Sequence, residues 1–281
     1  EYRLIRDYQN GEIIFDRRYG STNTFEKNNY PVGYNLGQSG NTPSQNLVDA
    51  YEMIDGTPFD WNNPEHKSNP YANRDPRLAM SILTNNVEFK DRTIEAWTGG
   101  RDGKGVIHAT RTGYYIYKFI DPNLDLLQNR TSVHHWVIMR YAEILLSYAE
   151  AMNEAYGPTG NVGYRLNAVR ALNQVRNRVG VEMPAVPTAI SKEELREKIR
   201  NERRVELAFE DHRFWDVRRW MIAPETLGAP LRGVEITKIS DEEFEYKPIE
   251  VEKRTFEPKM YLYPIPQTDL NTTGWVQNPL W

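Results

Sequence analysis

Three large aromatic residues, Trp61, Tyr71 and Trp97, occupy polar stretches rich in proline, glycine and asparagine, where regular structure is disfavoured. An aromatic ring on a loop can stack on the C–H face of a sugar, while nearby amide and guanidinium groups hydrogen-bond the hydroxyls. Side chains of those kinds stand close to the rings in sequence, at Asn62, Asn63, Asn73 and Arg101. We take this set as the candidate ligand-binding residues. The alternative is that each ring fills the core of a small loop cluster.

A second group with chemical potential is the run from Glu202 to Trp220, in which carboxylates alternate with arginines. A general acid needs a raised pKa, whereas an adjacent arginine lowers the pKa of a carboxyl group. On helices this alternation is typical of ion pairs three or four residues apart and of pairs between helices. We therefore interpret the run as structural. No spacing elsewhere singles out the facing carboxyl pair that a glycosidase needs, and we predict no catalytic residues.

Metal and cofactor chemistry has no support in the sequence. Cysteine is absent, which excludes disulfides, thiol nucleophiles and cysteine-based zinc sites. The histidines form no His-Glu-x-x-His pattern, and neither an EF-hand loop nor a glycine-rich phosphate loop occurs. The formal net charge of -4 is too small to indicate a nucleic-acid partner. We expect no catalytic metal, no cofactor and no nucleic acid. A bound Ca²⁺ among Asp60, Asn62, Asn63 and Glu65 stays open as the alternative to a solvated turn.

Residues 1–135 are rich in Gly, Pro, Asn and aromatic side chains, which predicts a loop-rich segment with short strands and helices. One short helix should begin at about Asn46, with Thr42 or Ser44 near its N-cap. We expect the ligand-binding face on this segment.

Residues 136–281 show helical periodicity and then a tail. Residues 136–140 predict a brief strand, and the apolar spacing from Tyr141 predicts a helix that Gly157 ends. A second helix is predicted over residues 163–179, antiparallel to the first, with Val179 on its apolar face.

A third helix is predicted from Ser191 to near Asp211, because Ser-Lys-Glu-Glu at 191–194 has the form of a capping box. A fourth, short helix should pass through Trp220 and end before Pro224. The tail from about Gly228 is expected to be extended and folded back over the helices.

Several segments resemble, in order, the motifs of the SusD/RagB family of outer-membrane nutrient-binding lipoproteins. They include Asn-Arg-Asp-Pro-Arg-Leu at 73–78, Glu-Arg-Arg-Val-Glu-Leu-Ala-Phe-Glu at 202–210 and Arg-Phe-Trp-Asp-Val-Arg-Arg-Trp at 213–220, with similar stretches at 42–56, 140–151, 172–178, 264–266 and 277–279. Family members begin with a lipidated Cys and tetratricopeptide-type helices, which this chain does not resemble. We therefore expect it to be the C-terminal portion of such a protein.

The resemblance implies a mostly α fold, with helical hairpins of tetratricopeptide-like type, long loop-rich segments and a few short strands. It further implies a surface-exposed lipoprotein of a gram-negative outer membrane, in contact with the membrane only through an N-terminal lipid absent from this chain. Such a protein would bind an oligosaccharide or polysaccharide, without catalysis, for delivery to a TonB-dependent SusC-like transporter.

Two other functions stay open. The chain could be a protein-interaction scaffold of the uptake complex without its own glycan site, or a glycoside hydrolase. Joint exposure of Trp61, Tyr71 and Trp97 would favour glycan binding over the scaffold, and a facing pair of carboxylates would favour the hydrolase.

Overall fold

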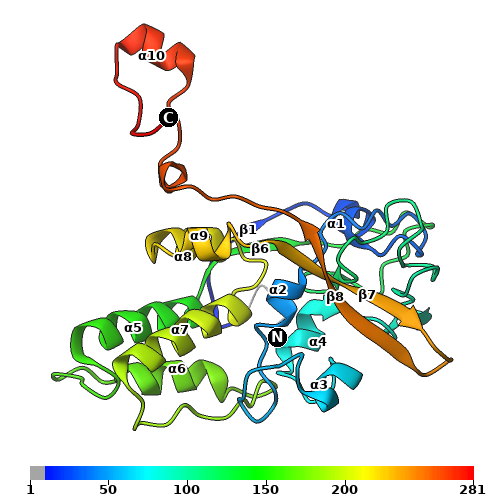
Figure 1. The fold of residues 1–281 in the computed structure, drawn as a ribbon, viewed down its shortest axis with the longest axis horizontal. Coiled ribbons are helices and arrows are strands. Elements are labelled where there is room, and N and C mark those ends of the chain that lie inside the picture. The colour runs from blue at the N-terminus through cyan, green and yellow to red at the C-terminus, as the bar shows by residue number, and fades with distance from the viewer. Residues whose placement is uncertain (1–9) are drawn as a thin grey trace.

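A computed structural model describes residues 10–281 of the chain. It consists of a block of packed helices, a loop-rich body with a long β-hairpin at its side, and a C-terminal segment that extends away from both (Figure 1). In chain order the elements are β1 (Ile13–Arg18), α1 (Thr24–Asn29), α2 (Gln45–Val48), α3 (Pro64–Ser68), α4 (Arg77–Ser81), β2 (Ile82–Leu83), β3 (Glu88–Phe89), β4 (Arg92–Thr93), β5 (Tyr115–Ile116), β6 (His135–Arg140), α5 (Tyr141–Tyr156), α6 (Ala168–Arg176), α7 (Lys192–Glu206), α8 (His212–Arg219), α9 (Ala223–Thr226), β7 (Leu231–Lys238), β8 (Phe244–Glu252), the 3-10 helix η1 (Pro258–Tyr261) and α10 (Gln267–Thr273).

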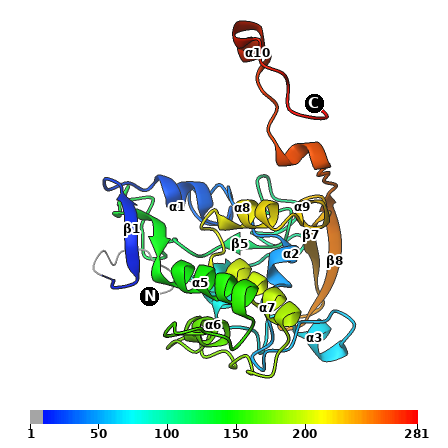
Figure 2. The same cartoon turned by 90° about the vertical axis from the view of Figure 1, so that its left-hand side faces the viewer.

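Helices α5, α6 and α7 lie side by side and form the helical block (Figures 1 and 2). Their apolar faces share a core in which Leu146, Leu172 and Ile199 are fully buried. The predicted strand and the helix from Tyr141 are confirmed as β6 and α5, and α5 ends where Gly157 adopts a φ of 74°. Each sheet in residues 10–281 is a two-stranded antiparallel ladder, so the expected helix-rich fold with few strands is confirmed.

The second predicted helix is shorter than its periodicity indicates. Helix α6 begins at Ala168, because the Asn167 side chain caps it by accepting the Arg170 N–H at 2.9 Å. It ends at Arg176, so Val179 lies beyond the helix and is 94% exposed rather than on an apolar face.

The third predicted helix begins where the capping box places it. The Ser191 hydroxyl accepts the Glu194 N–H at 3.2 Å, and the Glu194 carboxylate accepts the Ser191 N–H at 3.0 Å. The helix ends at Glu206 rather than near Asp211, because Phe209 and Asp211 adopt left-handed φ angles of 65° and 64° that no α-helix contains. The chain then starts the separate helix α8.

Buried ion pairs join the end of α7 to the loop-rich body. The Glu206 carboxylate accepts hydrogen bonds from Arg140 at 2.8 Å and from Arg77 at 2.9 Å. Glu210 accepts from Arg140 at 2.7 Å and from Lys118 at 2.6 Å. Burial by itself would raise the pKa of these carboxyl groups, but the cations outweigh it and lower the pKa of both. The predicted ion pairing is confirmed, although these glutamates pair with cations outside their own run.

The β7–β8 hairpin packs on the loop-rich body. Val234 and Ile236 of β7 and Tyr246 of β8 are buried in the same core as Tyr51 and Tyr115. A late part of the chain thus completes the core of an early part, which brings β8 close to the residues around Tyr71.

The expectation that the tail folds back over the helices is wrong. After β8 the chain runs away from the body, and α10 lies at its far end (Figures 1 and 2). Arg218 of α8 anchors the start of this segment by donating to the Met260 carbonyl at 2.7 Å. Farther out, Trp275 and Val276 are 63% and 88% exposed. None of the helices in the described residues is long and apolar enough to cross a membrane.

Candidate functional site

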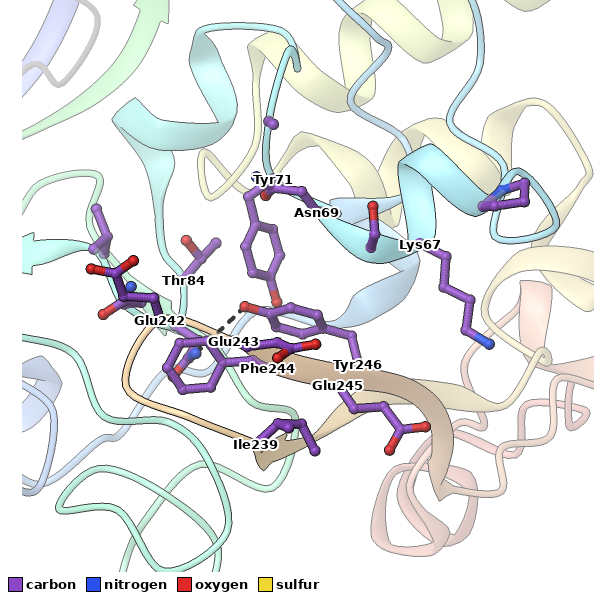
Figure 3. Close-up of a pocket in the computed structure, with 16 residues that line it drawn as sticks. Lys67, Asn69, Tyr71, Thr84, Ile239, Glu242, Glu243, Phe244, Glu245 and Tyr246 are labelled. Atoms are coloured by element: carbon purple, nitrogen blue, oxygen red, sulfur yellow. Dashed lines mark hydrogen bonds between the residues drawn. The ribbon is translucent and has the colours of Figure 1, made fainter.

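A cavity of about 960 Å³ lies between α3, the loop at residues 84–87 and the tip of the β7–β8 hairpin. We call it the hairpin groove. Its lining is Pro64, Lys67, Ser68, Asn69, Tyr71, Ala72, Thr84, Asn85, Asn86, Val87, Ile239, Glu242, Glu243, Phe244, Glu245 and Tyr246. Figure 3 shows Tyr71 and Tyr246 pointing toward one another, with Phe244 beside them. The volume is within the range of about 300–1,000 Å³ that small-ligand sites have.

Strand β8 sets the position of two rings in the groove. Residues two apart on a strand point to the same side, so Phe244 and Tyr246 share one face of β8. Tyr246 lies opposite the buried Ile236 of β7, which places this face against the body. Glu245, between the two rings, is exposed. The hairpin therefore turns its aromatic side toward Tyr71 and a carboxylate toward solvent.

Four rings form a continuous row that begins in the groove and ends outside its lining. From Tyr71 the row passes to Tyr246, Phe244 and Trp97, with ring centroids 5.3, 6.4 and 5.4 Å apart. These separations are typical of interacting aromatic pairs. All four rings belong to or pack against the main core, so packing holds each ring in place. Two of the predicted residues, Tyr71 and Trp97, are thereby connected through two residues that the sequence interpretation missed.

Fixed polar groups stand beside these rings. Asn85 is buried, and its side-chain oxygen accepts the Ala96 N–H at 3.1 Å. Its amide nitrogen lies 3.5 Å from the Tyr246 hydroxyl, at the outer limit of a hydrogen bond. Both groups line the groove and keep hydrogen-bonding capacity that a ligand hydroxyl can use.

A chain of polar side chains runs from the groove to Trp61. The Tyr71 hydroxyl donates to the Tyr114 hydroxyl at 3.3 Å, and Tyr114 donates to the Gln45 side chain at 2.5 Å. Gln45 and Trp61 both donate to one oxygen of Asp49, at 2.7 and 3.0 Å. The indole N–H of Trp61 is therefore used within the protein, and Trp61 lies outside the groove lining. Burial raises the pKa of Tyr71, which keeps its hydroxyl protonated as a donor.

The loop that carries Trp97 is held by two neighbouring residues. Asp102 is buried and accepts two hydrogen bonds from the Arg92 guanidinium, at 2.7 and 2.9 Å. Gly103 lies so close to the Trp97 carbonyl that an added Cβ would stand 1.7 Å from its oxygen, so only glycine fits. Asp102, which the sequence places among the acidic residues near Trp97, is thus a structural ion-pair partner.

The other predicted residues lie outside the groove lining. Asn63 caps α3, where its side chain accepts the Glu65 N–H at 2.9 Å. Asn62 is exposed, and Asn73 is exposed at a turn with a φ of 52°. Arg101 is exposed, 3.7 Å from the nearest carboxylate oxygen. A role for these side chains and for Trp61 in ligand contact stays a prediction.

The carboxylates that line the groove all come from one wall. They are Glu242, Glu243 and Glu245 at the hairpin tip, and the side chain of Glu245 points away from the rings toward solvent (Figure 3). Among the lining residues no carboxylate faces them from α3 or from the loop at residues 84–87. A sugar in the groove would therefore meet carboxylates from one side.

A helix-rich scaffold that presents a groove of fixed rings and amides on loops and a hairpin is typical of ligand-binding proteins. The SusD family model matches residues 11–281, and the chain belongs to this family. The family resemblance predicted from the motifs is confirmed.

Known proteins of this family are similar to the chain in sequence and in fold. SusD-like protein P2 of Formosa agariphila is 34% identical over 120 residues, which cover 41% of this chain and 22% of that protein. A solved SusD-like protein from Bacteroides fragilis is 30% identical with a TM-score of 0.81, over 100% of this chain and 57% of that one. A SusD-like carbohydrate binding protein from the same species is also 30% identical, with a TM-score of 0.76 over 92% of this chain and 53% of that one. The chain thus spans little more than half the length of these two structures.

Proposed function

We propose that this chain binds an oligosaccharide in the hairpin groove without cleaving it. The observation that carries the proposal is the row of fixed rings that enters the groove beside the amide of Asn85. Tyr71 and Phe244 are half-buried and offer ring surface to the C–H faces of sugars, the buried Tyr246 packs between them, and Asn85 offers hydrogen bonds to hydroxyls. Membership of a family with a member described as carbohydrate binding supports the same function.

The distribution of carboxylates supports binding without catalysis. Glycosidases place two carboxyl groups on opposite sides of the scissile bond, about 5–9.5 Å apart. The groove carboxylates Glu242, Glu243 and Glu245 share one wall. A bound sugar would be held between rings and amides, with no second carboxyl group across from the first.

We further propose that the whole protein is a lipid-anchored, surface-exposed component of a gram-negative outer membrane. It would pass the bound glycan to a TonB-dependent SusC-like transporter. Family membership supports both statements. The exposed apolar side chains of the C-terminal segment, such as Trp275 and Val276, favour a protein-interaction role as the second candidate.

Calorimetry against plant, mucin and microbial oligosaccharides tests the binding proposal. Phe244→Ala removes one ring of the row, and Trp275→Ala removes an exposed ring in the distant C-terminal segment. We expect binding without product formation, and a loss of about tenfold or more in affinity for Phe244→Ala only, equivalent to about 1.4 kcal/mol. Product formation would indicate a hydrolase. Binding that Phe244→Ala leaves unchanged would contradict the proposed site. If none of the oligosaccharides binds, the protein-interaction scaffold is favoured instead.

A further inference from the structure

A second cavity, of about 580 Å³, lies at the base of the β7–β8 hairpin, beside α2, α7, α8 and α9. Its charged lining residues are Arg204, Arg213, Arg232, Arg254, Asp49 and Glu225. We call this cavity the arginine pocket. Four arginines against two carboxylates leave a formal excess of positive charge in its walls. The hairpin groove lies at the other end of the same hairpin, so the two cavities are separate sites.

Arg213 is the arginine of the pocket that has no direct ion-pair partner among the described residues, and the negative charge of Asp216 attracts it only from a longer distance. In the part of the chain that the structure describes, its half-buried guanidinium makes no hydrogen bond and no ion pair. The nearest acid on its own helix, Asp216, already binds Arg203 at 2.9 Å and Arg219 at 2.9 Å. Burial and the neighbouring charge of Arg204 lower the pKa of Arg213 to about 10. A guanidinium that leaves water normally finds a partner, because the loss of hydration is costly.

The other three arginines of the pocket differ from Arg213 because each has a partner within the protein. Arg232 pairs with Asp49 at 2.7 Å, and Arg254 pairs with the exposed Glu252 at 3.0 Å. Arg204 donates one N–H to the Asn46 carbonyl, and burial lowers its pKa. A guanidinium has five N–H donors, so Arg204 retains donors that this bond does not use.

Of the two carboxylates in the pocket lining, Asp49 is paired with Arg232, whereas Glu225 would repel a bound anion. Glu225 lies on α9, is exposed, and forms no ion pair with any residue in the range 10–281. Exposed charges are weakened by water, whereas the half-buried guanidinium of Arg213 is shielded less. The balance of charge in the interior of the pocket is therefore positive.

We infer that the arginine pocket binds the anionic group of an acidic oligosaccharide, a uronic-acid carboxylate or a sulfate ester, between Arg204 and Arg213. Planar guanidinium groups match both oxyanions through paired N–H donors. Ser44 and Asn201 on the same lining can hydrogen-bond the sugar hydroxyls. The inference rests on the proposed function, because it names the class of glycan that a second site on this chain takes.

Thermal unfolding with inorganic sulfate gives the first test. Sulfate stabilises most proteins by exclusion from their surface, so the informative quantity is the difference between variants at matched ionic strength. Arg213→Gln removes the unpaired charge, and Arg170→Gln removes an exposed arginine of α6 outside the pocket as a matched control. We expect sulfate to raise the Tm of the wild type and of Arg170→Gln more than that of Arg213→Gln. Without sulfate, Arg213→Gln should melt at the wild-type temperature or above it, because it breaks no ion pair.

Calorimetry with trigalacturonate and with a sulfated galactose oligosaccharide then identifies the anion. We expect at least one of them to bind about tenfold more weakly to Arg213→Gln and more tightly to Glu225→Gln, with binding to Arg170→Gln unchanged. The oligosaccharide whose affinity falls in Arg213→Gln shows whether the pocket binds a carboxylate or a sulfate ester. Equal binding of both by wild type and Arg213→Gln would overturn the inference, as would a response to inorganic sulfate alone. Binding of neutral oligosaccharides and its loss in Phe244→Ala test the hairpin groove alone. The proposed function and the arginine-pocket inference can therefore fail independently of each other.

Discussion

The Tyr246 ring lies edge-on to the Tyr71 ring, with centroids 5.3 Å apart and planes at 84°. This contact joins the loop after α3 to a strand near the other end of the chain. Because both rings also line the hairpin groove, the groove depends on the hairpin being packed against the body. The hairpin is therefore a wall of the site as well as a part of the core.

Trp61 should matter more for stability than for ligand affinity. Trp61→Phe keeps most of the ring but removes the indole N–H that donates to Asp49 at 3.0 Å. We expect a loss of about 1.5–3 kcal/mol in the free energy of unfolding, which is the net contribution of one hydrogen bond to a charged group. Oligosaccharide affinity should stay within about twofold of the wild type. Urea unfolding and calorimetry check both values, and a tenfold loss of affinity at unchanged stability would instead place Trp61 in contact with the ligand.

Arg140 should be among the most costly residues to change. Arg140→Gln leaves the buried carboxylates of Glu206 and Glu210 without the partner they share. Loss of one partner of a buried ion pair costs about 3–5 kcal/mol. Arg196→Gln is the control, because Arg196 pairs with Glu154 at 2.6 Å on the surface, where such pairs contribute below about 1 kcal/mol. Equal losses in urea unfolding would show that burial does not set the strength of these pairs.

The same glutamates predict how stability depends on pH. The folded protein lowers the pKa of Glu206 and Glu210 below the ordinary value of 4.5, so the folded state binds fewer protons than the unfolded state in acid. Their stabilisation is present above that value and is lost as the pH falls through the folded pKa. We expect the free energy of unfolding to fall below about pH 5 and the fall to be shallower in Glu210→Gln. An unchanged slope in Glu210→Gln would exclude Glu210 as a cause of acid instability.

Local signals predicted some element boundaries correctly and missed others, such as the start of α6 at Ala168. The capping box at Ser191 and the glycine at 157 set the start of α7 and the end of α5 correctly, because both act through neighbouring backbone groups. The end of α7 could not be predicted in the same way. Phe209 adopts a left-handed φ angle between Glu206 and Glu210, which bind cations from distant parts of the chain. The spacing of apolar residues along the helix cannot predict such long-range contacts.

The residues of the hairpin groove and of its row of rings could be predicted only in part, for a related reason. Tyr71 and Trp97 are noticeable because they are large rings in polar stretches. Phe244 and Tyr246 lie two residues apart in a strand, so their side chains point to the same side. The sequence pattern predicts this shared side but not which residues it faces. Only the packing of the hairpin on the body shows that the two rings face Tyr71.

Hydrogen exchange followed by mass spectrometry can locate a bound oligosaccharide on the protein. The exchange is compared with and without a saturating amount of the tightest-binding oligosaccharide of the panel. If the oligosaccharide binds in the hairpin groove, we expect slower exchange in peptides that cover the hairpin tip at residues 239–246 and the opposite wall at residues 84–87. Slower exchange confined to residues outside both walls, with the hairpin tip unchanged, would contradict binding in the hairpin groove.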